Sequence, residues 1–164
     1  MRNSLHPTQR LDHFDIAILE TLQNDAAVSF AQLGERVNLS PSAVQRRVQA
    51  LKADGVITGT RAILDPRKIG QALTIILEIT LESDRTDLLA QIRRRLIAAA
   101  EVQHCYYVTG EYDLVVVLTL ADIQALKHFV ARMLAVDDNV RRYKTSVVME
   151  SIKSTTAYPL DVAV

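Results

Sequence analysis

The spacing of apolar and polar residues divides the chain into a helical first third and a mixed remainder. Apolar residues recur at helical spacing from Leu11 to Asn24. Two shorter helical segments follow between Ser29 and Gly55, separated by a tight turn at Asn38. Asparagine enters the left-handed region more readily than most residues, so a sharp reversal is expected there. This part of the chain predicts three helices, the last two forming a helix-turn-helix.

The second helix of this pair has one apolar face and one polar face. Ser40 is placed to cap it, and Pro41 takes the first helical position, where a missing N–H costs nothing. Val44, Val48 and Leu51 form an inward stripe. The opposite face carries residue types that read base edges in the major groove, although a solvated surface helix has the same pattern. The candidate DNA-binding residues on this helix are Ser40, Ser42, Gln45, Arg46, Arg47 and Gln49.

A short hairpin, or wing, is predicted directly after the helix pair. Apolar residues at 56–57 and 63–64 flank a turn at Thr58-Gly59. Arg61 would lie on this wing and contact a phosphate, which adds affinity but no sequence information. We therefore add Arg61 to the candidate DNA-binding residues.

The spacing of apolar residues changes after the proline and glycine of Asp65–Gly70. Alternating and continuous apolar runs predict strands, and 3.6-residue periodicity predicts two helices between them. The order is βαββαβ, the ferredoxin-like arrangement, in which both helices lie on one face of an antiparallel sheet. The other face of the sheet would expose apolar residues to water, so we expect it to be covered by dimerisation through the sheet. The expected strands are 73–82, 103–109, 114–120 and 140–152, and the expected helices are 86–99 and 123–134.

These patterns predict an α+β protein with two domains. A winged helix-turn-helix domain is expected over residues 1–64, a linker over 65–72, and a ferredoxin-like domain over 73–164. The 164-residue chain has no formal net charge, with 19 basic and 19 acidic side chains. Its basic side chains are concentrated near the predicted recognition helix. Residues 40–70 hold Arg46, Arg47, Lys52, Arg61, Arg67 and Lys68 against Asp54 and Asp65.

The remaining composition favours a cytoplasmic protein without a cofactor. Cys105 is the single cysteine, which excludes an internal disulfide and a multi-cysteine metal site. No apolar run reaches the roughly 18–20 residues of a membrane span, and the polar N-terminal arm lacks a signal-peptide core. Phosphate-binding glycine loops and nucleophile elbows are also missing, so neither a metal nor a cofactor is expected.

The chain resembles the Lrp/AsnC (feast/famine) family of bacterial and archaeal transcription regulators over Leu11 to Lys153. The order and spacing of several short motifs carry this resemblance. They are Leu11-Asp12, Asp15, Ile18-Leu19, Leu22-Gln23, Asp25, Leu39-Ser40-Pro41-Ser42, Arg47-Val48, Gly55-Val56-Ile57, Val108–Asp113 and Val147–Glu150. The resemblance implies a DNA-binding domain joined to an effector domain that dimerises and builds higher oligomers, often octamers.

The resemblance also implies an effector, usually an amino acid or a related small molecule, bound between effector domains. A zwitterion needs acceptors for its ammonium group, such as Asp113 or Thr145, and amide donors for its carboxylate, such as a glycine turn. The same Gly-x-x-Asp turn is also ordinary hairpin chemistry. The candidate effector-binding residues are Thr109, Gly110, Glu111, Tyr112, Asp113, Tyr143 and Thr145.

An enzyme is the main alternative, because sirohaem decarboxylases share this architecture and bind a tetrapyrrole with histidine and arginine. His104, His128 and Arg93–Arg95 are the residues that keep this alternative open. The three arginines span nearly a full helical turn, so they do not converge on one point. A DNA recognition helix would also have no role in such an enzyme. We therefore expect a regulator without enzymatic activity, and we expect Cys105 to serve in packing.

Overall fold

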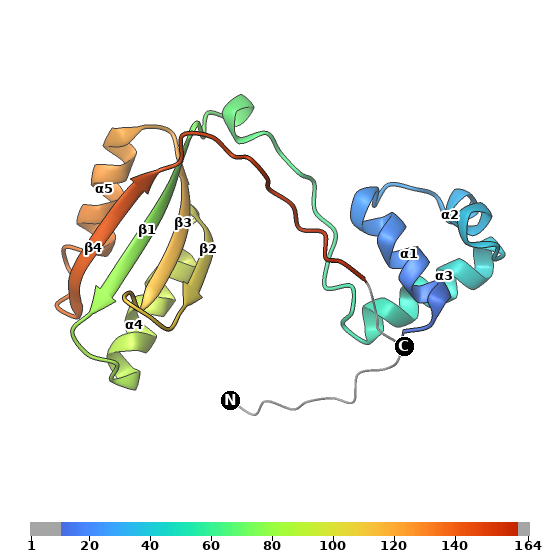
Figure 1. Ribbon diagram of the computed structural model, residues 1–164, viewed down its shortest axis with the longest axis horizontal. Coiled ribbons are helices and arrows are strands. Elements are labelled where there is room, and N and C mark those ends of the chain that lie inside the picture. Colours follow the sequence, from blue (N-terminus) through green and yellow to red (C-terminus); the bar gives the residue numbers. More distant parts are fainter. Residues whose placement is uncertain (1–10, 161–164) are drawn as a thin grey trace. The chain divides into compact units, whose positions relative to one another are not determined.

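The computed structural model describes residues 11–160, which fold as two compact units (Figure 1). The first unit contains the chain up to Ala62 together with the segment that begins at Lys153, and the second is Ile63–Ile152. The C-terminal segment therefore belongs with the helical unit, whereas the sequence pattern assigned it to the ferredoxin-like domain. Leu160 explains the difference, because its side chain packs against the core of the helical unit.

Each helix of the first unit begins at a side-chain cap. Asp12 accepts from the amide of Asp15, Ser29 from Gln32, and Ser40 from Ala43. The first two caps are capping boxes, in which the third helical residue bonds back to the cap. The helices are α1 (His13–Asn24), α2 (Phe30–Val37) and α3 (Pro41–Ala53).

The turn between α2 and α3 depends on two residues with special backbone requirements. Asn38 is left-handed, with φ 54° and ψ 44°, as expected from its sequence position. The Leu39 amide then donates to the Gly34 carbonyl at 3.0 Å. A Cβ on Gly34 would lie 2.5 Å from the Leu39 carbonyl oxygen, so only glycine fits this close approach. The turn brings α2 and α3 together over a core of Ile18, Leu19, Leu33, Val37, Val44, Val48 and Leu51.

The predicted wing is not formed, and residues 56–65 contain no strand. The amides of Val56 and Ile57 both donate to the Leu51 carbonyl, at 2.9 and 3.0 Å. This folds the segment back onto α3, where Ile57 packs against the helical core. Ile63 and Leu64, the other half of the expected hairpin, are 92% and 62% exposed. Ile57 is therefore partly buried by the helices rather than by a partner strand.

The second unit has the expected βαββαβ order. After a short 3-10 turn, η1 (Pro66–Ile69), four antiparallel strands lie in the order β2-β3-β1-β4. The last strand is shorter than predicted: the Val148 amide donates to Thr74, and the chain then leaves the sheet. The elements are β1 (Leu73–Leu81), α4 (Thr86–Ala98), β2 (Val102–Tyr107), β3 (Leu114–Leu120), α5 (Ile123–Met133) and β4 (Val140–Val147).

The two faces of the sheet differ in burial. Both helices cover one face (Figure 1), where Ile75, Leu77 and Ile79 of β1 are fully buried. On the other face, Ile76 is 37% exposed and Tyr106 is 53% exposed. No helix formed by the described residues covers this open face. None of the helices formed by residues 11–160 is long and apolar enough to span a membrane.

Candidate nucleic-acid interface and effector site

The exposed face of α3 presents most of the predicted DNA-binding residues together. Val44, Val48 and Leu51 are buried, which fixes the rotation of the helix about its axis. The residues at positions i, i+3, i+4 and i+7 on the opposite side are therefore exposed along one line. These four residues are Ser42, Gln45, Arg46 and Gln49.

Ser40 lies at the N-terminus of this face and has a structural role. Its hydroxyl accepts from the Ala43 amide at 3.2 Å and shares a hydrogen bond with the Ser42 hydroxyl at 3.1 Å. The cap leaves the remaining amides of the first turn and the partial positive charge of the helix terminus on the same side as Ser42. A helix N-terminus with free amides of this kind can bind a phosphate.

Arg47 lies beside this face but is bound within the protein. Its Nη1 atom donates to Asp12 and to Asp15, both at 2.8 Å, and the guanidinium lies 5.2 Å from the centre of the Phe14 ring. The hydrogen bond to Asp15 raises the pKa of Arg47 above its usual value, although burial acts in the opposite direction. Arg47 therefore holds α3 against α1, and we leave it out of the proposed DNA contacts.

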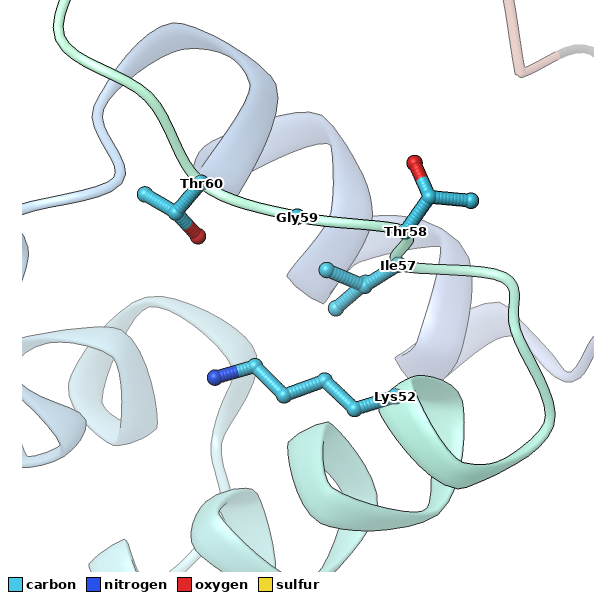
Figure 2. Close-up of a pocket in the computed structure, with 5 residues that line it drawn as sticks. All are labelled: Lys52, Ile57, Thr58, Gly59 and Thr60. Atoms are coloured by element: carbon cyan, nitrogen blue, oxygen red, sulfur yellow. The ribbon is translucent and has the colours of Figure 1, made fainter.

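Beyond α3, the extended segment 57–60 and Lys52 frame a shallow hollow (Figure 2). Ile57 and Lys52 face one another across it, and Thr60 lies at its rim. Arg61 follows on the same exposed segment, although not on a wing. Lys52 was counted among the basic side chains near the predicted recognition helix but was not a candidate DNA-binding residue, because a basic residue in the last turn of a helix is common. Lys52 lies in the last turn of α3, and Arg61 lies on the exposed segment that follows the hollow.

The predicted effector loop between β2 and β3 is anchored by Asp113. Its amide donates to the Ile79 carbonyl at 2.9 Å, and its carbonyl accepts from the Val108 amide at 3.0 Å. Its carboxylate oxygen Oδ2 accepts from the Leu81 amide at 2.8 Å. Gly110, at φ 131°, makes the turn itself. Asp113 therefore ties the loop to β1, and one of its two carboxylate oxygens already accepts a hydrogen bond from the protein.

The two predicted effector residues of β4 lie on the same face of the sheet. Tyr143 pairs with Ile79 and Thr145 pairs with Leu77, so both project from the helix-covered face, at its β4 edge. Arg142 projects from the opposite face, and its Nη2 atom donates to Glu111 at 3.0 Å. The structure thus joins the loop to β4 through Arg142, a residue that the sequence pattern did not single out.

Three of the residues proposed for a tetrapyrrole enzyme, His104, Arg93 and Arg95, have separate partners. The Tyr106 hydroxyl and His104 Nδ1 are 3.3 Å apart, and their rings are stacked. Arg93 lies over the Tyr107 ring, with 4.9 Å to the ring centre, and Arg95 pairs with Asp137. The histidine and the two arginines thus each bind a different neighbour.

Cys105 is half-buried in β2. Burial raises the pKa of its thiol above the ordinary value, and the charge of Arg93 acts in the opposite direction. A thiol with a raised pKa is less nucleophilic near neutral pH, which favours a role in packing.

Family models match both units of the chain. An AsnC-type helix-turn-helix domain matches residues 11–52, and an Lrp/AsnC ligand binding domain matches residues 74–158. The chain belongs to the Lrp/AsnC family. The resemblance inferred from short motifs is thereby confirmed, and this Lrp/AsnC protein is a transcriptional regulator by family.

Individual relatives agree with this assignment. A proline dehydrogenase transcriptional activator of Rhizobium radiobacter is 34% identical over 155 residues, covering 94% of this chain and 99% of that protein. The leucine-responsive regulatory protein of Escherichia coli is 32% identical over 149 residues, covering 91% of each. The structure of a Neisseria meningitidis transcriptional regulator in complex with L-Met has a TM-score of 0.88 and 31% identity, covering 93% of this chain and 98% of that chain. These relatives favour a regulator over a tetrapyrrole-binding enzyme.

Proposed function

We propose that this Lrp/AsnC protein binds double-stranded DNA by placing α3 in the major groove. The observation that carries the proposal is the exposed line of Ser42, Gln45, Arg46 and Gln49 on a helix whose other face is buried. Arginine pairs with guanine and glutamine with adenine, so this line offers donors and acceptors for base edges. Lys52 and Arg61 then serve as phosphate contacts at the end of the helix.

The proposed effector is an amino acid that binds near the β2–β3 loop. The chain is similar over nearly its whole length to a regulator solved with L-Met and to a leucine-responsive regulator. The proposed effector site includes the loop Thr109–Asp113 that was predicted from the sequence. The turn at Gly110 in this loop exposes backbone amides. Tyr143 and Thr145 belong to the proposal only as neighbours on the other face of β4.

The proposed assembly is a homodimer formed through the open face of the sheet. Ile76, Val115 and Val117 lie on this face among partly exposed positions, and Tyr106 adds a large aromatic side chain. Covering such a face with a second copy removes apolar surface from water. A dimer also supplies two copies of α3 for successive major grooves, and higher oligomers would extend the array.

A gel-shift measurement tests the proposal, with DNA from upstream of the protein's own gene and each of the twenty amino acids in turn. We expect a specific shift that Arg46→Ala weakens by ~1–3 kcal/mol. Arg94→Ala removes the same charge from an exposed position on α4 and is the matched control. Equal loss in the two variants would show that Arg46 contributes only charge, and the absence of any shift would remove the DNA-binding proposal.

A further inference from the structure

The C-terminal segment of the chain returns to the unit in which the chain began. The unit that holds α1, α2 and α3 also holds the segment that begins at Lys153, and the sheet unit lies between them in the sequence. We propose that residues 153–160 form a strap, a second tether of the helical unit, which sets the spacing of DNA half-sites that a dimer accepts. The inference rests on the proposed function, because this spacing matters only if a dimer brings two copies of α3 to DNA.

The strap is bound through the main chain of Tyr158. Its amide donates to Gln23 Oε1 at 2.6 Å, and its carbonyl accepts from Gln23 Nε2 at 3.2 Å. Pro159 follows, and a residue before proline is restricted to extended conformations. An extended residue presents its amide and its carbonyl to the same side, where one side-chain amide can bond to both. Tyr158 is 76% exposed, so the attachment uses its main chain rather than its ring.

Leu160 gives the strap a second attachment. Its side chain packs against the helical core, as does that of Leu22 next to Gln23 on α1. Before these contacts, the Ala157 amide donates to the Thr155 hydroxyl at 3.1 Å and turns the chain locally. One attachment is polar and the other is apolar, so each can be removed by a substitution that leaves the other in place.

Both connections between the units leave the sheet at the same place. β1 and β4 are antiparallel neighbours, so β1 begins where β4 ends (Figure 1). Ile75 pairs with Val147, and the Val148 amide donates to the Thr74 carbonyl at 2.9 Å. On the helical unit, by contrast, the two connections belong to different helices. The first continues from the end of α3, and the strap binds α1.

The first connection by itself places few limits on the helical unit. The main chain of residues 58–64 makes no hydrogen bond with any residue between 11 and 160, and Ile63 is 92% exposed. A domain held by one such linker can rotate through many orientations. A second attachment on another helix removes much of this rotation. In a dimer, the orientations that remain decide how far apart, and on which side of the duplex, two half-sites can lie.

Gel shifts with two DNA fragments test the strap. The first comes from upstream of the protein's own gene. The second is the same fragment with about five base pairs, half a helical turn, inserted at the centre of the region that the protein protects from nuclease. For the unmodified protein, we expect the insertion to weaken binding by about tenfold or more, because the two half-sites can no longer be bound together. Gln23→Ala and Leu160→Ala should each reduce this penalty to about threefold or less.

Two controls separate the strap from a general loss of stability. Tyr158→Ala removes the exposed ring but keeps both main-chain bonds, so it should keep the penalty of the unmodified protein. A variant that is merely less stable loses the same fraction of folded protein on both fragments, so the ratio of the two affinities does not change. Exchange of the Tyr158 amide reports the attachment directly and should be faster in Gln23→Ala than in the unmodified protein.

The outcomes distinguish the strap from the proposed function. An equal insertion penalty in Gln23→Ala and the unmodified protein would overturn the strap and leave DNA binding by α3 standing. Equal exchange of the Tyr158 amide in the two proteins would also overturn it, because the segment would then not be attached in solution. If the unmodified protein shifts neither fragment, the DNA-binding proposal and the strap fail together.

Discussion

The side-chain amide of Gln23 holds the main chain of Tyr158 at both of its polar groups. The Tyr158 amide donates to Gln23 Oε1 at 2.6 Å, and Gln23 Nε2 donates to the Tyr158 carbonyl at 3.2 Å. These residues are 135 positions apart in the chain. With Leu160 packed against the helical core, the bonds make the C-terminal segment a part of the helical unit.

Gln23→Ala should therefore loosen the helical unit. It removes both bonds to Tyr158, and we expect the unit to lose about 1–2 kcal/mol of stability. Amide hydrogen exchange of α1 and α3 measures this loss for the helical unit by itself. Asn24→Ala is the matched control, because the Asn24 side chain, among the described residues, donates only to the Glu20 carbonyl of α1. Equal exchange in the two variants would mean that the Tyr158 contact adds no stability.

Gly34→Ala should destabilise the helix-turn-helix more than any other glycine change in the helical unit. The new Cβ would lie 2.5 Å from the Leu39 carbonyl oxygen, a backbone atom that cannot move without shifting the turn. We expect a loss of about 1–3 kcal/mol in urea unfolding. Gly59→Ala meets no atom within 4 Å and serves as the control. A Gly34→Ala variant as stable as Gly59→Ala would show that the turn relaxes freely.

Local signals explain which parts of the fold were predictable from the sequence. The cap at Ser40 and the left-handed Asn38 depend on residues within four positions of themselves, and the structure confirms both predictions. The βαββαβ order was also predicted, because strand and helix periods differ along the chain. Features of this kind need no knowledge of distant residues.

The features that were mispredicted or missed depend on distant partners. The apolar pattern over 56–64 predicted a hairpin, but the amides of Val56 and Ile57 instead donate to the Leu51 carbonyl at the end of α3. Arg47 was predicted as a DNA contact from its residue type alone, and the sequence did not show that the packing of α1 brings Asp12 and Asp15 beside it. Arg142 gave no signal at all, because its relation to Glu111 depends on the register of β4.

Arg46 and Arg47 are adjacent but should respond differently to replacement by alanine. Arg47→Ala leaves Asp12 and Asp15 without their cation, so we expect a loss of about 1–3 kcal/mol of stability. Arg46 is exposed, and Arg46→Ala should change stability by less than about 0.5 kcal/mol while weakening DNA binding. Urea unfolding and gel shifts on both variants measure the two effects. A stable Arg47→Ala protein with weakened DNA binding would reverse the assignment.

Asp12 should make the stability of the helical unit depend on pH. Burial opposes its ionisation, but the hydrogen bond from the Asp15 amide and the charge of Arg47 outweigh it and hold the pKa of Asp12 below its usual value of 3.8. A carboxyl group whose pKa is lower in the folded state stabilises the protein above the unfolded pKa. That stabilisation is lost as the pH falls through the folded pKa.

Asp12→Asn isolates this effect, because asparagine also caps helices but carries no charge. Above about pH 5 the variant should be less stable than the unmodified protein by a constant amount. The difference should shrink toward zero as the pH falls below 3.8, which urea unfolding at several pH values would measure. In the Arg47→Ala background the same substitution should have a smaller effect, because the partner of the charge is gone. A difference that grows as the pH falls would contradict the lowered pKa and require another source for the interaction between α1 and α3.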